Sequence, residues 1–340
     1  MLKRIKATDL QVGMHVVLSA GWLNHPFLKN SFRINSEGQI KKILESGLED
    51  VMIDTQKGIF SAPAGKSTRT GAGMGETGNE IEIPVEWEPE KLVPSDLLEA
   101  LRDSGMDSRE KAGAIYRSSI TLMEKLLKDP VAKNIREAKT GIKEIVDIIL
   151  SETSTARELL KITTHDLYTY THSVNVGVLA VLLSKSVPKS IPGGLAGQDM
   201  HELGAGFFLH DLGKVRVDSN IINKRGPLTP EEMEEVKKHP QKGCEMVSEA
   251  GELTEECRAI ILQHHERFDG SGYPMGLKGH EIPLSGYICA VADVFDAITS
   301  NRSYQKSLTT FQALNYMKEK LEGKFYKQVF DEFVLLFAPR

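Results

Sequence analysis

Residue types that bind metals lie inside or at the ends of apolar helical runs in the second half of the chain. Eight of the ten histidines fall between positions 165 and 280. His264 and His265 directly follow the apolar run that ends at Gln263, and Asp293 stands inside the apolar run 288–295. A carboxylate buried in a helix is costly unless it is paired or bound to a metal. The pattern therefore predicts a fold in which distant helices bring these groups together.

Seven side chains make up this set, and all of them offer nitrogen or oxygen: His172, His210, Asp211, His239, His264, His265 and Asp293. Such ligands without a thiolate suit iron, manganese, cobalt or nickel more than a structural zinc. Seven ligands exceed the needs of one ion with an open position, so we expect two ions with Asp211 as a bridge. Two adjacent ions clamp the attacking and leaving oxygens of a phosphoryl displacement and lower the pKa of a shared water. This chemistry is hydrolysis of a phosphodiester or phosphomonoester.

The N-terminal part predicts a small α+β domain over residues 1–85. Short β-branched stretches at 11–18, 32–34 and 51–54 indicate strands, and a helix is expected from 39 to 46, where Gly47 ends it. Residues 61–80 hold five glycines and no hydrophobic period, which indicates a flexible linker or loop. Residues 81–85 are expected to form a last strand.

Helical patterns dominate the remainder. Connecting helices are expected within 94–150, over 95–128 and 130–150, with apolar positions at helical spacing. Their apolar faces are compatible with packing against the next domain or with a homodimer through the same helices. From 151 to 340 the pattern is helical with no recurring strand signature, and a capping box at Thr229 to Glu232 starts one helix. The fold class expected is α+β overall, with an all-α bundle after the small first domain.

Composition limits the classes of function. A chain of 340 residues holds about two domains. A net charge of −5 argues against general nucleic-acid binding. Three cysteines without a pattern do not make a disulfide framework, the N-terminus lacks the apolar stretch of a signal peptide, and a run of about 18 apolar residues is absent. We therefore expect a cytoplasmic protein without membrane insertion.

Three motifs carry a resemblance to a known family. The stretch His210-Asp211-Leu212-Gly213-Lys214 resembles the doublet of the HD metal-dependent phosphohydrolases. Residues 264–274, ending in Gly-Tyr-Pro, resemble the second signature of the HD-GYP subfamily, and 292–304 match its third block. The resemblance covers about 150–340, and 1–85 resembles, less sharply, the small domain that often precedes it. The resemblance implies an HD-type helical bundle and a bacterial protein.

The resemblance also implies an activity. Members hydrolyse cyclic di-GMP to pGpG, and often on to GMP, through a hydroxide between two metal ions, most often iron or manganese. One ion would take His172, His210, Asp211 and Asp293, and the other Asp211, His239, His264 and His265. Lys214 would contact a phosphate and stabilise transition-state charge. The remaining substrate contacts would come from Tyr273, Arg302, Arg267 and Lys306.

Two positions depart from the family pattern. Tyr168 stands where some members have a glutamate that supports a third metal, so we expect two ions. Gln305 stands where a basic residue is common, with Lys306 one step later. A catalytically weak domain that binds cyclic di-GMP or a signalling protein, or a hydrolase of another nucleotide, stays open. Asp296 is expected to orient a ligand, and Arg267 is expected to pair with Asp269. His165, His201 and His280 are expected to lie outside the site.

Overall fold

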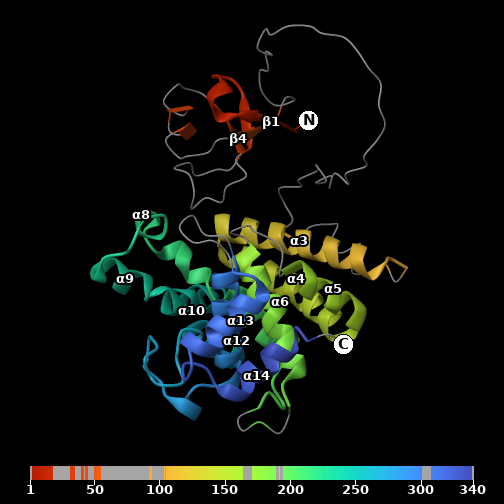
Figure 1. Ribbon diagram of the computed structural model, residues 1–340, viewed down its shortest axis with the longest axis vertical. Helices are drawn as coiled ribbons and strands as arrows, with labels where there is room; N and C mark the ends of the chain where they lie inside the picture. The colour runs from red at the N-terminus through yellow and green to blue at the C-terminus, as the bar shows by residue number, and fades with distance from the viewer. Residues whose placement is uncertain are drawn as a thin grey trace. The chain divides into compact units, whose positions relative to one another are not determined.

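The structure is a computed structural model whose chain forms two compact units, Met1–Lys91 and Leu92–Arg340 (Figure 1). The residues it describes are 2–17, 31–34, 40–41, 43–44, 50–54, 92–93, 103, 105–163, 171–188, 191, 194–224, 226–300 and 308–338. The linker predicted at 61–80 and the strand predicted at 81–85 lie outside these residues. The same holds for Tyr168, Arg302, Gln305 and Lys306.

The first unit is built on an antiparallel sheet of four strands in the order β1-β4-β2-β3. The strands are β1 (Leu2–Lys6), β2 (His15–Val17), β3 (Ser31–Arg33) and β4 (Asp50–Asp54). Val16 pairs with Ile53 across β2 and β4, and both are buried together with Ile43 from a short helical stretch. The predicted α+β character of this unit is confirmed, with β1 as an additional strand.

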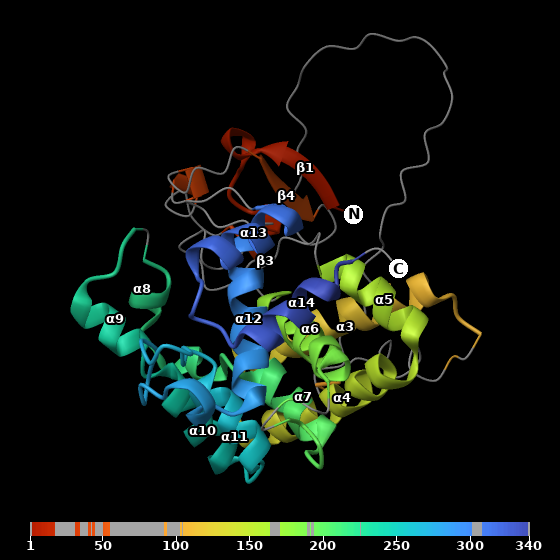
Figure 2. The same ribbon diagram turned by 60° about the horizontal axis from the view of Figure 1, so that its bottom comes forward.

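The second unit is helical throughout its described part (Figures 1 and 2). Its first helices are α3 (Ser108–Lys128), α4 (Ala132–Ser151), α5 (Thr153–Thr163), α6 (Thr171–Ser186) and α7 (Met200–Leu209). Its later ones are α8 (Ser219–Ile222), α9 (Pro230–Val236), α10 (His239–Glu249), α11 (Glu255–Gln263), α12 (Leu284–Thr299), α13 (Thr310–Lys320) and α14 (Lys327–Leu335). Two 3₁₀ turns are η2 (Leu212–Arg216) and η3 (Gly279–Glu281). The predicted all-α architecture is confirmed.

Local signals explain where these helices begin. The Thr229 hydroxyl accepts from the Glu232 N–H at 3.2 Å, and the Glu232 carboxylate accepts from the Thr229 N–H at 2.7 Å. This is the predicted capping box, with Pro230 in the first turn of α9. Asp107 caps α3 more simply, with its side chain accepting from the Arg109 N–H. Helix starts are therefore encoded within three or four residues.

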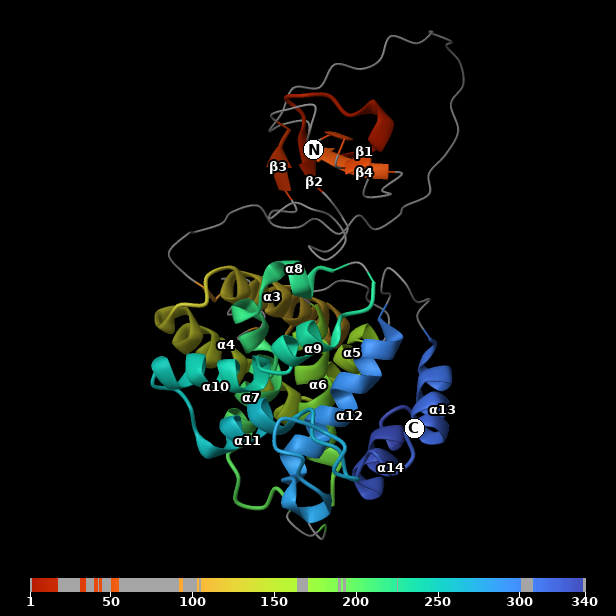
Figure 3. The same cartoon turned by 90° about the vertical axis from the view of Figure 1, so that its left-hand side faces the viewer.

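The core is centred on α6, whose residues 173–184 are all buried. Helices α7 and α12 pack along it (Figure 3). A Cβ at Gly177 would lie 2.3 Å from the Phe208 ring, so glycine is what lets α6 and α7 approach this closely. α3 and α4 belong to the same core, with Ile115 and Ile142 fully buried. The finer division proposed at residue 151 stays a prediction. None of the described helices is long and apolar enough to cross a bilayer.

Candidate metal centre

Five helices of the second unit deliver seven ligand-type side chains to one place. These side chains fall into two groups, and within each group the candidate ligand atoms lie within 4.8 Å of one another. The first group is His172, His210 and Asp293, and the second is Asp211, His239, His264 and His265. All seven residues predicted as metal ligands are therefore brought together.

Asp211 belongs to the second group but also borders the first, and it turns one oxygen toward each. Its Oδ1 lies 3.3 Å from His239 Nε2 and 3.8 Å from His264 Nε2. Its Oδ2 lies 3.4 Å from His172 Nε2 and 3.5 Å from His210 Nε2. A carboxylate shared in this way is the geometry of a bridge between two cations.

Position in the helix orients most of the imidazoles. In three of them the ring Nδ1 lies 2.8–2.9 Å from the backbone carbonyl three residues earlier: His210 with Phe207, His239 with Val236 and His264 with Ile261. Only a protonated Nδ1 can donate to a carbonyl, and in the neutral tautomer that does so the lone pair lies on Nε2. Each of these Nε2 atoms faces Asp211, which leaves three lone pairs directed at the same space.

Two buried atoms in the cluster test whether a cation fits. His210 Nε2 and Asp211 Oδ1 are buried and make no hydrogen bond. Burial of such polar atoms is costly unless they find a partner. Both are metal-ligand atoms, and their neighbours are imidazole nitrogens and carboxylate oxygens. The donor set therefore fits metal ions of the kind that accept mixed nitrogen and oxygen ligands.

The protonation states agree with this interpretation. Burial alone would raise the pKa of Asp211 and Asp293. Lys214 and His210 hold the pKa of Asp211 well below its usual range, and His172 and His265 do the same for Asp293. Burial and adjacent imidazoles lower the pKa of His264, and burial lowers that of His265 to about 3. The carboxylates are thus ionised and these two imidazoles neutral, which is the state in which they bind metal.

His172 has a different environment because carboxylates surround it. Burial would lower its pKa, but hydrogen bonds to Asp211, Asp293 and Asp296 raise it well above the usual value. Its Nδ1 lies 2.7 Å from Asp296 Oδ2, while its Nε2 lies 3.2 Å from Asp293 Oδ1. Asp296 therefore holds the far side of the ring, as the sequence predicted for an orienting residue.

Lys214 and Gly213 follow the doublet on η2. The Lys214 ammonium lies 2.5 Å from Asp211 Oδ2, and its side chain is 36% exposed, so it borders both the cluster and solvent. A Cβ at Gly213 would stand 2.0 Å from the His239 carbonyl oxygen, so only glycine allows η2 to touch α10 here. This close approach brings His239 to the doublet.

A buried carboxylate, that of Glu266, holds the loop after α11 in place. Glu266 is 1% exposed and accepts from the Met275 N–H at 2.7 Å and the Leu277 N–H at 3.0 Å. The Tyr273 ring stacks on His265, with centroids 4.7 Å apart and planes 27° from parallel. A Cβ at Gly272 would meet backbone atoms at 2.4–2.6 Å. The loop thus holds Tyr273 against a candidate ligand.

Other expected contacts of the loop differ from the prediction. Asp269 pairs with Lys324, whose Nζ lies 2.5 Å from its Oδ2, and also accepts from Ser271. The Arg267 guanidinium lies over the Phe325 ring, 5.6 Å from its centroid. The expected pairing of Arg267 with Asp269 is therefore wrong, because the Asp269 carboxylate is paired with Lys324 instead.

Of the histidines expected outside the site, His201 and His280 lie away from the cluster. His201 Nε2 lies 2.6 Å from Asp147, and the His280 ring stands edge-on to the Phe268 ring. His165 lies outside the described residues. Sequence reasoning missed Lys237, whose ammonium lies 5.8 Å from the centroid of the Tyr273 ring. No periodic signal marks it, because the contact joins the end of α9 to an irregular loop.

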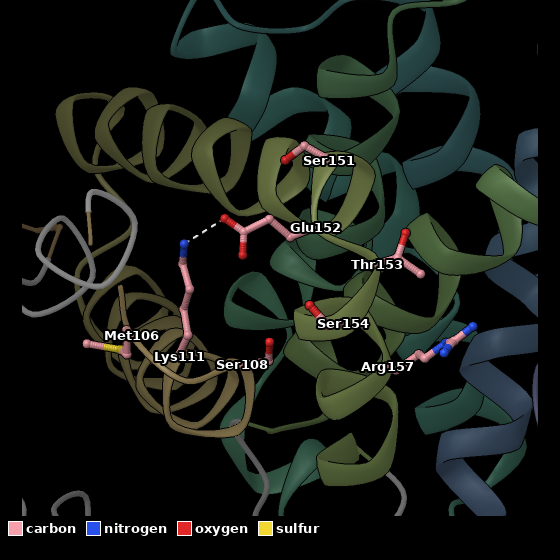
Figure 4. Close-up of a pocket in the computed structure, with 8 residues that line it drawn as sticks. All are labelled: Met106, Ser108, Lys111, Ser151, Glu152, Thr153, Ser154 and Arg157. Carbon is pink, nitrogen blue, oxygen red and sulfur yellow. Dashed lines mark hydrogen bonds and ion pairs between the residues drawn. The ribbon is translucent and has the colours of Figure 1, made fainter. Parts of the chain in front are cut away.

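A cavity of about 630 Å³ lies apart from this cluster, between the starts of α3 and α5 (Figure 4). Its lining residues are Met106, Ser108, Lys111, Ser151, Glu152, Thr153, Ser154 and Arg157. Lys111 and Glu152 pair across it at 2.6 Å. None of the seven ligand-type residues lines it, so the cluster and this cavity are separate features.

The helical unit gathers five imidazoles and two carboxylates around a His-Asp doublet. This arrangement defines the class of HD-domain proteins, which are metal-dependent. Comparison with known families agrees with this class, since the family model described as "HD domain" matches residues 194–327. A second description, "Domain of unknown function (DUF3391)", matches residues 2–138.

Relatives narrow the class to a family. The chain is 34% identical to "Cyclic di-GMP phosphodiesterase PA4108" of Pseudomonas aeruginosa over 98% of this chain and 76% of the relative. It is 39% identical to a "Cyclic di-GMP phosphodiesterase" of Thermotoga maritima over 50% of this chain and 45% of that protein. The chain belongs to the HD-GYP family. A solved structure, "Bd1817, a HDG"Y"P protein from Bdellovibrio bacteriovorus", has the same fold, with a TM-score of 0.57, 18% identity, and coverage of 99% of this chain and 100% of that one.

Proposed function

We propose that the protein is a metal-dependent phosphodiesterase that hydrolyses cyclic di-GMP to pGpG. The placement of Asp211, with one carboxylate oxygen toward each group of ligands, is the observation that carries the proposal. The similarity to cyclic di-GMP phosphodiesterases along nearly the whole chain supports the substrate. The Gly272-Tyr273-Pro274 stretch favours this substrate over other nucleotides.

The chain's own residues have distinct roles in this proposal. His172, His210, Asp211 and Asp293 would hold one ion, and Asp211, His239, His264 and His265 the other. When bound, the pair of ions supplies Lewis acidity to the phosphate and lowers the pKa of water. Lys214 places a cation beside the bridging carboxylate, where it stabilises negative charge on a phosphate oxygen.

The loop would contribute substrate contacts. Tyr273 presents an aromatic face whose position is fixed by its stacking on His265, and aromatic faces stack with nucleobases. Lys237 lies next to that ring and adds a positive charge. Arg267 stays a proposed substrate contact because of its place in the motif at residues 264–274. Arg302 and Lys306 stay proposed contacts, since they lie outside the described residues.

Several finer properties belong to the proposal. We assign iron or manganese to the site because its donors are imidazoles and carboxylates without thiolate. We place the protein in the cytoplasm, with signalling proteins as further partners. A homodimer through the connecting helices would have to use their outward faces, because Ile115, Leu122 and Ile142 are buried in the chain's own core.

Incubation of anaerobically purified protein with iron or manganese and cyclic di-GMP tests the proposal. Linear product should form in wild type and disappear in Asp211→Ala. His201→Ala is the matched control, because this histidine pairs with Asp147 outside the cluster and its loss should leave turnover intact. Binding of cyclic di-GMP without turnover in every metal would instead support a signalling module. Faster cleavage of 3′,3′-cyclic GMP-AMP would reassign the substrate.

A further inference from the structure

A continuous chain of buried hydrogen bonds runs from α3 to the candidate metal ligand His172. The Tyr116 hydroxyl donates to Asn175 Oδ1 at 2.7 Å, and Asn175 Nδ2 donates to Asp296 Oδ1 at 2.7 Å. The other oxygen of Asp296 lies 2.7 Å from His172 Nδ1. Three of these four residues are at most 2% exposed: Tyr116, Asn175 and Asp296.

We propose that Tyr116 and Asn175 are positioning residues of the metal centre, which act on His172 through Asp296. The inference rests on the metal site proposed above. It extends the orienting role of Asp296 to two side chains that are not themselves candidate metal ligands. It also connects α3, at the start of the helical unit, to one of the two ligand groups.

The donors and acceptors permit one consistent arrangement. An ionised carboxylate accepts only, so both groups that face Asp296 must donate. The amide nitrogen of Asn175 therefore points at Asp296, and its oxygen is left to accept from Tyr116. His172 likewise donates from Nδ1 to Asp296, so that with an ion bound its Nε2, which lies beside Asp211 and Asp293, would be the nitrogen that binds the metal. Every link fixes the direction of the next.

Burial makes the arrangement consequential. In a water-excluded interior an unpaired polar group is costly, so loss of one link is not repaired by solvent. Without the Asn175 amide, Asp296 would keep, among the described residues, His172 and the Ser300 hydroxyl at 3.1 Å as side-chain donors. The carboxylate would then be free to rotate, and the imidazole would lose its fixed orientation. Three of the other imidazoles, those of His210, His239 and His264, rely on backbone carbonyls and would not be affected.

The expected effect is selective for one ion. Partners behind a ligating histidine typically contribute about 10–100-fold to metal affinity or activity. We expect Asn175→Ala to weaken one of the two bound ions by about that factor, and Tyr116→Phe, one link further away, to weaken the same ion by several-fold. The ion held by His239, His264 and His265 should keep its affinity. Steady-state kcat should fall with little change in KM, because substrate contacts are untouched.

Competition of the metal-free full-length protein with a chelator, measured for each ion in turn, tests the inference. Tyr287→Phe is the matched control, because its buried hydroxyl also donates a 2.7 Å hydrogen bond, to the Gly279 carbonyl, away from the chain of bonds. Selective weakening in Tyr116→Phe but not in Tyr287→Phe supports the proposal. Wild-type affinity for both ions in Tyr116→Phe, or equal weakening in Tyr287→Phe, overturns it.

The same titration separates this inference from the proposed function. A wild-type chain that binds no ion would refute the metal centre and the positioning role together. A wild-type chain that binds two ions, with variants that bind them identically, would refute only the positioning role. Asn175→Ala carries some risk of misfolding, and Tyr116→Phe retains the packed ring, so the second variant keeps the test decisive.

Discussion

The buried carboxylate of Glu266 should determine how firmly the loop that carries Tyr273 is held. It accepts from the N–H groups of Met275 and Leu277 at 2.7 and 3.0 Å and is 1% exposed. A hydrogen bond to a charged group contributes about 1.5–3 kcal/mol. The two together should stabilise the closed loop by about 3–6 kcal/mol, which Glu266→Ala would remove.

Hydrogen exchange gives the direct measurement. Because each 1.4 kcal/mol corresponds to about a tenfold change in an equilibrium, the amides of Met275 and Leu277 should exchange about 10²–10⁴ times faster in Glu266→Ala. Amides in α4, which belongs to a different part of the core, should exchange as in wild type. If the enzyme is active, KM should rise, because Tyr273 is no longer held against His265.

Glu281→Ala is the matched control for this prediction. Glu281 also accepts a backbone hydrogen bond, from the Lys278 N–H at 2.8 Å, but it is exposed. Its loss should cost about 0.5–2 kcal/mol, the usual range for a capping contact, and only at η3. Unchanged exchange at Met275 and Leu277 in Glu266→Ala, or an equal loss in Glu281→Ala, would refute the reasoning.

Three other predictions concern packing and charge in the helical unit. Gly213→Ala places a Cβ 2.0 Å from a backbone oxygen of α10 and should lower Tm and metal content. Gly113→Ala faces only the movable end of an arginine side chain, so it should be neutral or stabilising by about 0.5–1 kcal/mol. Thermal melts and elemental analysis compare the two variants. Lys139→Met removes the buried partner of Glu202, which lies 2.7 Å away, and should lower the free energy of unfolding in urea by about 3–5 kcal/mol. Lys143→Met should lower it far less, because the Lys143 side chain is 42% exposed. Equal losses would contradict the burial argument. Burial would raise the pKa of Glu202, but hydrogen bonds from the lysines lower it. Its contribution to stability is therefore present above its unfolded pKa and lost as pH falls through the folded pKa. The stability difference between wild type and Glu202→Gln should narrow toward low pH, and a constant difference would contradict the lowered pKa.

The members of the candidate metal centre could be predicted because their placement obeys local rules. His210 and His264 are helix-end residues whose rings bond to the carbonyl three positions earlier, so an apolar run followed by histidine already encodes the orientation. Asp293 was recognisable because a carboxylate in an apolar helix demands a partner. The all-α fold of the second unit followed from the same helical periodicity.

The contacts that support the site were not predictable in the same way. Tyr116 meets Asn175 across 59 positions, and no period in the sequence relates them. Glu266 bonds to backbone groups in an irregular loop, where side-chain patterns carry no information about N–H directions. Asp269 had an obvious local partner, but tertiary packing supplied Lys324 from 55 positions away. Long-range pairing of polar groups depends on the packing of the elements that carry them.

The central claim is that Asp211 joins two ions in one centre, and metal stoichiometry tests it most directly. Elemental analysis of protein purified anaerobically and loaded with iron or manganese should find about two ions per chain in wild type. Asp211→Ala should hold fewer, since it removes an oxygen from each ligand group. At most one ion per wild-type chain under every metal supplied, or two ions retained in Asp211→Ala, would contradict the account.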